Sequence, residues 1–140
     1  MIDLPKIRAG FVGFGEVNSP RDLIERKCQA AQRALEDRGL ELVATVPVSD
    51  DPAGQDEARA RAELARADFD ALVICVAGWI PSHSVIDVIS PFSHKPMVLW
   101  GLAGEMAGGR LITTADQAGA SALRDPMEAL GFKFKYVYDI

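Results

Sequence analysis

The chain has 140 residues, of which 49% are hydrophobic and 25% are charged, which is the composition of one globular domain with a single core. Its net charge is −5, and no basic stripe offers the phosphate-neutralising surface that nucleic-acid binding requires. The apolar runs are too short to span a bilayer, and the first residues lack the pattern of a signal peptide. We therefore expect one domain, residues 1–140, in a cytoplasmic protein that binds neither nucleic acids nor membranes.

Apolar runs typical of β-strands alternate with helical stretches along the sequence. The expected strands cover residues 7–14, 40–48, 71–76, 97–100 and 132–138. The first expected helix begins at Asn18-Ser19-Pro20, an N-cap candidate followed by proline, and ends at Gly39. Further helices are expected over residues 55–67, 84–89 and 116–130, with Asp116 capping the last and with Asp50 and Asp51 as turn and N-cap residues.

The repeated β-α pattern predicts a parallel sheet with helices on both faces, because crossover connections are right-handed. The fold class is therefore α/β: a single three-layer α/β/α domain whose five-stranded parallel sheet has the flavodoxin-like order 2-1-3-4-5. The fifth strand alternates aromatic residues with lysines, which is the pattern of a half-exposed edge strand.

The carboxyl ends of parallel strands share one edge of the sheet, and α/β sheets usually bind small molecules there. The loops at residues 13–19, 49–51, 78–83 and 101–105 follow the expected strands and belong to this edge. The connections on the opposite edge have ordinary loop chemistry. We therefore place the functional face on the first edge.

The loop after the third expected strand contains a tryptophan, a hydroxyl and an imidazole within a few residues. Trp79 offers an apolar face to a sugar or polyol, and the candidate polar contacts are Glu16, Asn18, Ser82 and His83. Each has an ordinary alternative role: Trp79 could cap the core or fill a subunit interface, His83 could cap a helix, and Glu16 could be solvated. Trp100 ends a strand and is expected in the core.

Familiar cofactor patterns are incomplete in this sequence. Residues 13–18 begin like a dinucleotide fingerprint, but Asn18 occupies the position of the third glycine. No Walker loop or nucleophile elbow occurs, and the two histidines, His83 and His94, fit no metal-binding pattern. Cys28 and Cys75 are expected to be reduced thiols in the core.

Several segments together resemble the amino-terminal domain of the L-fucose and L-arabinose isomerase family. They are GFVGFGEVNSPRDLIERK at 10–27, VSDDP at 48–52, VAGWIPSH at 76–83, LWG at 99–101 and TTADQAG at 113–119. The resemblance spans essentially the whole chain, although members of the family are much longer. It implies an aldose–ketose isomerase that works through a metal-bound ene-diol, with manganese held by acidic residues and a histidine of later domains.

On this resemblance, the amino-terminal domain helps to build a homo-oligomer and covers the substrate in a neighbouring subunit's site. Trp79 is then the residue that contacts the sugar, no catalytic or metal-binding residue lies in this chain, and the chain alone lacks isomerase activity. Two alternatives stay open. The chain could be a self-standing flavodoxin-like module for small-molecule binding or interaction, or a small nucleotide-binding protein that holds a phosphate with residues 13–19 at a helix N-terminus.

Overall fold

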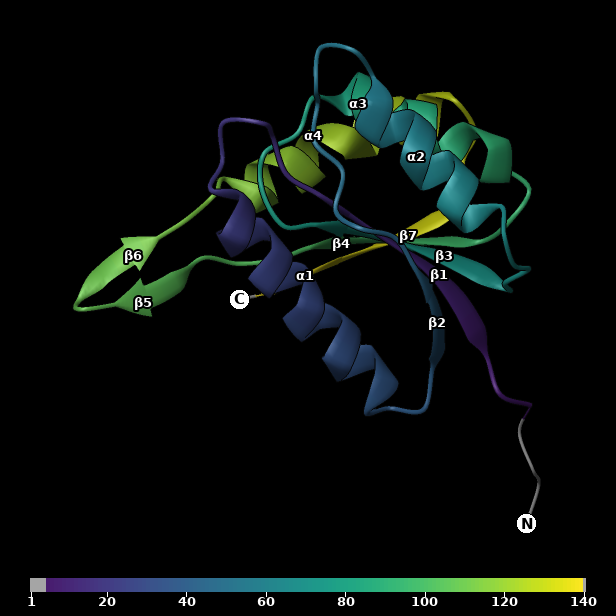
Figure 1. Ribbon diagram of the computed structural model, residues 1–140, viewed down its shortest axis with the longest axis horizontal. Helices are drawn as coiled ribbons and strands as arrows, with labels where there is room; N and C mark the ends of the chain where they lie inside the picture. The colour runs from purple at the N-terminus through teal and green to yellow at the C-terminus, as the bar shows by residue number, and fades with distance from the viewer. Residues whose placement is uncertain (1–4, 140) are drawn as a thin grey trace.

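The computed structural model describes residues 5–139 and contains a five-stranded parallel sheet (Figure 1). The strands are β1 (Arg8–Phe14), β2 (Glu41–Ala44), β3 (Ala71–Val76), β4 (Met97–Gly101) and β7 (Phe134–Tyr138). Their spatial order is β2-β1-β3-β4-β7, so the expected α/β fold with strand order 2-1-3-4-5 is confirmed. The second strand is shorter than expected, because beyond Ala44 only Val48 pairs again, in a single bridge to Phe14.

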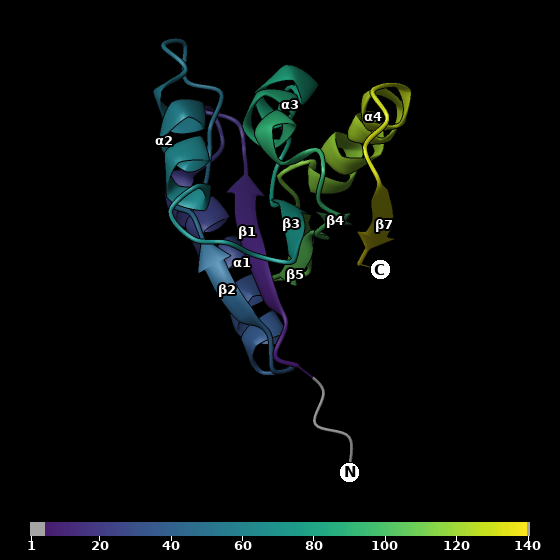
Figure 2. The same ribbon diagram turned by 90° about the vertical axis from the view of Figure 1, so that its right-hand side faces the viewer.

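The helices cover the two faces of the sheet unequally (Figure 2). They are α1 (Arg21–Glu36), α2 (Gln55–Leu64), α3 (Ser82–Ile89) and α4 (Asp116–Ala129), with a 3₁₀ turn at Ser90–Phe92. The buried residues of α2, α3 and α4 belong to one core cluster, whereas those of α1 belong to the cluster on the other face. None of the helices in residues 5–139 has the length and apolarity to cross a bilayer.

Helix α1 packs very closely on the sheet, and glycines permit the approach. A Cβ atom on Gly13 would lie 2.3 Å from Cys28 Sγ, and one on Gly15 would lie 2.5 Å from Ile24 Cδ1. These separations are far below van der Waals contact. The two glycines that begin like a dinucleotide fingerprint therefore have a packing role in this fold, independent of any cofactor.

The two cysteines meet in the cluster under α1. Cys28 and Cys75 are both free and buried, which confirms the expectation of core thiols. A hydrogen bond with Cys28, together with burial, raises the pKa of the Cys75 thiol. Since the thiolate is the reactive form of cysteine, Cys75 is poorly suited to act as a nucleophile.

A β-hairpin follows β4, just beyond the loop expected at residues 101–105, in a stretch for which no strand was expected. Its strands are β5 (Glu105–Ala107) and β6 (Arg110–Ile112), and the intervening Gly108 and Gly109 have φ angles of 57° and 75°. Two consecutive left-handed residues are the requirement of a tight hairpin turn, and glycine adopts them without strain. Figure 1 shows the hairpin projecting from the body of the domain.

None of the expected capping residues occupies an N-cap position, since Gly54 is the N-cap of α2, but Asp51 bonds the first amides of that helix. Pro20 itself is the N-cap of α1 and no side chain caps that helix, so Ser19 does not cap it. Asp116 is the first residue of α4 and is buried; Ala115 occupies the N-cap. At α2, by contrast, the Asp51 carboxylate accepts hydrogen bonds from the backbone N–H groups of Gln55 and Asp56, at 3.0 and 2.8 Å.

Asp56 connects the start of α2 to the loop after β2. Its carboxylate accepts hydrogen bonds from the backbone N–H and the hydroxyl of Ser49, both at 2.9 Å, and pairs with Arg59. Burial opposes ionisation of Asp56, but the bonds from Ser49 and Arg59 outweigh it and lower its pKa below the ordinary value. The stability contributed by the ionised carboxylate is therefore present above the pKa of the unfolded chain and is lost as the pH falls through the folded pKa.

We expect Asp56→Asn to lower stability at neutral pH and to flatten the loss of stability between about pH 5 and pH 2. Urea unfolding followed by circular dichroism at a series of pH values measures this. Asp125→Asn, which changes an exposed carboxylate on α4, serves as the control. If the stability of Asp56→Asn falls with pH as steeply as that of the wild type, the lowered pKa of Asp56 does not contribute to the pH dependence of stability.

Candidate functional site

Backbone hydrogen bonds join three segments at the carboxyl ends of the strands. The Glu16 N–H donates to the Trp79 carbonyl at 2.6 Å, and the Trp79 N–H donates to the Thr114 carbonyl at 2.7 Å. The N–H groups of Ala77 and Gly78 also donate to the Phe14 carbonyl. The loops after β1 and β3 therefore lie side by side on one edge of the sheet, as expected from the parallel topology. We call the segments 14–19, 77–83 and 113–115 the rim.

Trp79 is held firmly at the centre of the rim. Its N–H and carbonyl groups are both used, and a Cβ on Gly119 of α4 would lie only 3.3 Å from its Cα. Even so, 37% of the residue is exposed. An indole with a fixed backbone and an open face provides a preorganised apolar surface for a ligand.

The other four expected contacts lie on two rim segments, residues 14–19 and 77–83, of which the second also holds Trp79. Glu16 and Ser82 are half-buried, whereas Asn18 and His83 are exposed. Ser82 and His83 are the first two residues of α3. Within residues 5–139 the polar side-chain atoms of these four residues have no hydrogen-bond partner. Their polar groups are accordingly available to a ligand, and no hydrogen bond joins any two of these described side chains.

Four backbone amides of the loop after β1 already donate hydrogen bonds within the protein. The N–H of Gly15 donates to the Val48 carbonyl, that of Ser19 to the Glu16 carbonyl, and that of Val17 to the Asp50 carboxylate at 2.8 Å. With the Glu16 N–H bonded to Trp79, these amides are already satisfied inside the protein. A carboxylate also occupies the place where an anion would approach. These contacts argue against the nucleotide-binding alternative.

A metal site in the described residues would require several ligand side chains at one place. In the part of the chain that the structure describes, no three His, Cys, Asp or Glu side chains come together in a way that could hold a metal ion. Apart from Glu16, the carboxylates near the rim are engaged: Asp50 accepts a hydrogen bond from the Val17 N–H, Asp51 accepts hydrogen bonds at the start of α2, and Asp56 accepts hydrogen bonds from Ser49. The residues described here do not fit a manganese site.

A buried ion pair that no local sequence pattern indicates lies close to the rim. Lys27 of α1 pairs with Asp116 of α4, and its Nζ also donates to Thr114 Oγ1 at 3.1 Å. The Thr114 hydroxyl donates in turn to the Ala77 carbonyl at 2.6 Å. The Asp116 side chain is only 2% exposed. This cluster connects α1, α4 and the rim segment that holds Trp79.

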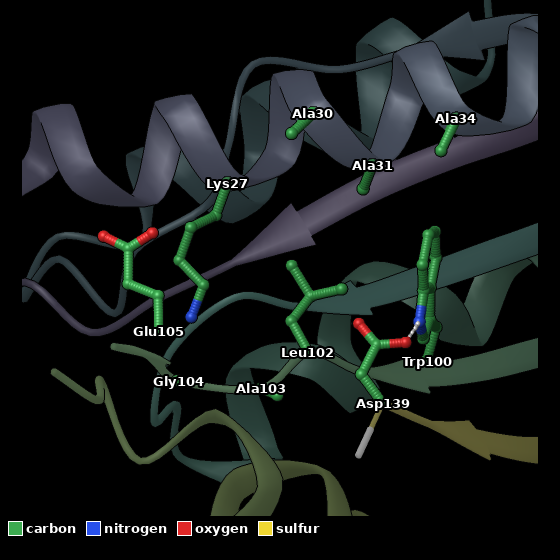
Figure 3. Close-up of a pocket in the computed structure, with 10 residues that line it drawn as sticks. All are labelled: Lys27, Ala30, Ala31, Ala34, Trp100, Leu102, Ala103, Gly104, Glu105 and Asp139. Carbon is green, nitrogen blue, oxygen red and sulfur yellow. Dashed lines mark hydrogen bonds between the residues drawn. The ribbon is translucent and has the colours of Figure 1, made fainter. Parts of the chain in front are cut away.

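A hollow of about 360 Å³ opens beside Lys27, between α1 and the end of β4 (Figure 3). The small residues Ala30, Ala31 and Ala34 line it on the helix side. Trp100 lines it on the sheet side and is half-buried, so it is less enclosed than expected. The Trp100 Nε1–H donates to Asp139 Oδ1 at 3.3 Å. Trp100 thus packs on the α1 side of the sheet with part of its surface open.

No protein-family model matches this sequence, and no curated protein matches it significantly. The fold and the geometry of the rim are therefore the basis on which a function is inferred.

Proposed function

We propose that this chain is the amino-terminal domain of a cytoplasmic L-fucose/L-arabinose isomerase-like protein, in which it covers the substrate and contributes to the oligomer. The observation that supports the proposal best is the position of Trp79. Its backbone is fixed between Glu16 and Thr114 at the carboxyl edge of a parallel sheet, and its indole remains partly open. This is the edge at which α/β sheets bind small ligands.

A sugar presents apolar C–H faces and directional hydroxyl groups, and the rim offers a counterpart to each. The indole of Trp79 suits the C–H face, and the free polar groups of Glu16, Asn18 or Ser82 suit the hydroxyls. Isomerisation of an aldose needs in addition a base, an acid and an electrophile at one place. In this proposal another part of the complete protein supplies them, and the present domain binds without catalysing.

Trp79→Ala is expected to weaken sugar binding about tenfold, the effect of losing an apolar contact worth about 1.4 kcal/mol. The measurement is a titration of the purified chain with L-fucose, L-arabinose and their ketoses. It is read by intrinsic fluorescence in a Trp100→Phe background, where Trp79 is the one remaining tryptophan, and by thermal shift for the alanine variant. Trp100→Phe alone is the matched control and should leave the affinity unchanged.

The same samples should be incubated with manganese and assayed for ketose formation. Binding without turnover is the expected result. Formation of ketose by the 140-residue chain would show that the catalytic groups are present after all. An affinity that is unchanged in Trp79→Ala would remove the rim from consideration as the sugar site.

A further inference from the structure

Strand β7 forms one edge of the sheet, and its outer side is open. In the strand order it has β4 as its neighbour on one side only, and Figure 2 shows it at the outer side of the sheet. Such an edge presents a row of backbone N–H and C=O groups that can pair with another strand. Proteins use an open edge of this kind to bind a second chain by strand addition.

Every second residue of β7 turns its backbone groups outward. On the β4 side, the Lys133 carbonyl accepts the N–H of Met97 at 2.9 Å. At the other end of the strand, the Asp139 N–H donates to the Gly101 carbonyl at 3.1 Å. Because backbone direction alternates along a strand, the odd-numbered residues bond β4 and the even-numbered ones face away from it. The outward residues are Phe134, Tyr136 and Tyr138. Within residues 5–139, the backbone groups of these three have no hydrogen-bond partner.

The charges along this edge are complementary to those of a second, antiparallel copy. Segment 133–139 has three charged side chains, those of Lys133, Lys135 and Asp139, and all three are exposed. None of them forms an ion pair with another residue between positions 5 and 139. If Tyr136 lies opposite its own copy, Lys133 lies directly opposite the partner's Asp139, and Lys135 lies opposite the partner's Val137. Opposite charges that face each other across two strands stabilise the pairing.

The neighbouring registers are less favourable. Outward backbone groups must lie opposite outward groups, so the symmetry axis can move only in steps of one residue. With the axis at Lys135, two lysines face each other. With the axis at Val137, a lysine still faces an aspartate, but the paired stretch shrinks to 135–139. Lysines on an edge strand usually prevent pairing, whereas here they favour the one register that pairs 133–139 without like charges opposite each other.

The other face of β7 suits the same register. The rings of Tyr136 and Tyr138 stack with their centroids 5.4 Å apart, and 55% of Tyr138 is exposed. Pairing would place Tyr138 against the partner's Phe134 and the two copies of Tyr136 against each other, and aromatic pairs across strands are stabilising. The Arg124 guanidinium lies 4.9 Å from the centroid of the Tyr136 ring. Glu128, one turn further along α4, gives this side of the axis a negative charge as well.

We propose that β7 pairs antiparallel with β7 of a second copy of this chain, about a two-fold axis at Tyr136, so that the two sheets become one. Tyr136 then exchanges backbone hydrogen bonds with its own copy, and Phe134 and Tyr138 exchange them with each other across the interface. A two-fold contact closes on itself, so assembly stops at the dimer. This dimer specifies the oligomer of the proposed function and rests on that part of it alone. Its tests measure assembly, so the dimer can fail while sugar binding holds, and the reverse.

Disulfide trapping tests the contact and its register. Lys135 and the partner's Val137 form a pair without hydrogen bonds between their backbones, whose Cα atoms lie about 4.5 Å apart, within the range of a disulfide. A mixture of Lys135→Cys and Val137→Cys chains should therefore form a mixed disulfide in preference to either homodimer, since the native Cys28 and Cys75 are buried. Preferential homodimers of Lys135→Cys or of Val137→Cys would place the axis one residue away and overturn the register. The lack of any disulfide between chains would overturn the contact.

Sedimentation over a range of concentrations measures the strength of the dimer. A single pair of strands is a small interface, so the dimer should be weak. Lys133→Asp should raise its dissociation constant about tenfold, and Lys133→Asp/Asp139→Lys should restore it, because the facing charges are then exchanged. A double variant as weak as Lys133→Asp would mean that these two residues do not face each other. Arg66→Asp, the same charge change at an exposed residue after α2, is the matched control and should dimerise like the wild type.

Proline at an outward position tests the backbone hydrogen bonds. Tyr138→Pro removes an N–H that faces away from β4, a place where an edge strand tolerates proline, and should abolish the dimer. Tyr138→Thr loses the same ring but keeps the N–H, so it should still dimerise. Circular dichroism checks that both variants fold. A wild-type chain that is monomeric at about 1 mM would overturn the proposal, and so would a dimer that withstands Tyr138→Pro.

Discussion

Asp116→Ala should lower the free energy of unfolding by about 3–5 kcal/mol, the cost of removing one partner from a buried ion pair. The Asp116 and Lys27 side chains are 2% and 16% exposed, so the ammonium group that remains is largely shielded from water. Lys27 would keep only the hydroxyl of Thr114 as a partner. A buried cation that has lost its counter-ion is among the few causes of an effect this large.

Urea unfolding of Asp116→Ala measures the loss, with Asp125→Ala as a control for removing a carboxylate from the exposed side of the same helix. The double variant Lys27→Met/Asp116→Ala removes both charges and should regain much of the lost stability, because no charge is then left uncompensated. If Asp116→Ala is as stable as Asp125→Ala, the ion pair does not hold α1 and α4 together.

The same pair also supports the candidate binding surface. Lys27 bonds the Thr114 hydroxyl, and the Thr114 carbonyl accepts the N–H of Trp79. The rim segment is thus fixed by a contact between two helices that lie on opposite faces of the sheet. A preorganised surface loses less conformational entropy when a ligand binds, so the ion pair has a role in recognition as well as in stability.

Strong local patterns made most of the sheet predictable. The continuous apolar run at 71–76 predicts the bounds of β3 correctly, since a strand that is buried on both faces has no polar residues within it. The alternation in β7 correctly indicated an edge strand, because only one of its faces meets the core. Because Glu16 and Trp79 each follow a parallel strand, the topology alone predicts that they lie at the same edge of the sheet, whatever their side chains are.

The remaining features depend on contacts between distant residues. Lys27 and Asp116 are 89 positions apart, and an aspartate at the start of a helix has the local pattern of a cap, which is why its burial was missed. The hairpin strands have three residues each, and all of these residues are exposed. They therefore lack the alternation of buried and exposed residues that predicts a strand, and the local signal for the hairpin is the Gly108-Gly109 turn. Trp100 ends a buried strand, but it is only half-buried because α1 lies over β1 and β2 and covers β4 in part.

Gly13→Ala is expected to lower the free energy of unfolding by about 2 kcal/mol through overpacking. The added Cβ would lie 2.3 Å from Cys28 Sγ and 3.3 Å from Cys28 Cβ, in a cluster that is almost completely buried. Gly13 belongs to β1, which has a neighbouring strand on each side, and its φ is not positive, so the backbone itself accepts alanine. The whole cost therefore comes from crowding between the strand and α1.

Removing the Cys28 sulfur, which the new Cβ would crowd, should restore part of the stability that Gly13→Ala loses. Cys28→Ala alone should cost about 1 kcal/mol, because it leaves a small void. In Gly13→Ala/Cys28→Ala the new methyl group occupies that void, and the double variant should be more stable than Gly13→Ala alone. Thermal and urea unfolding of the four proteins give the coupling energy. Additive losses would mean that the Cys28 side chain does not crowd position 13, and that Gly13 is needed for a reason other than the close approach of α1.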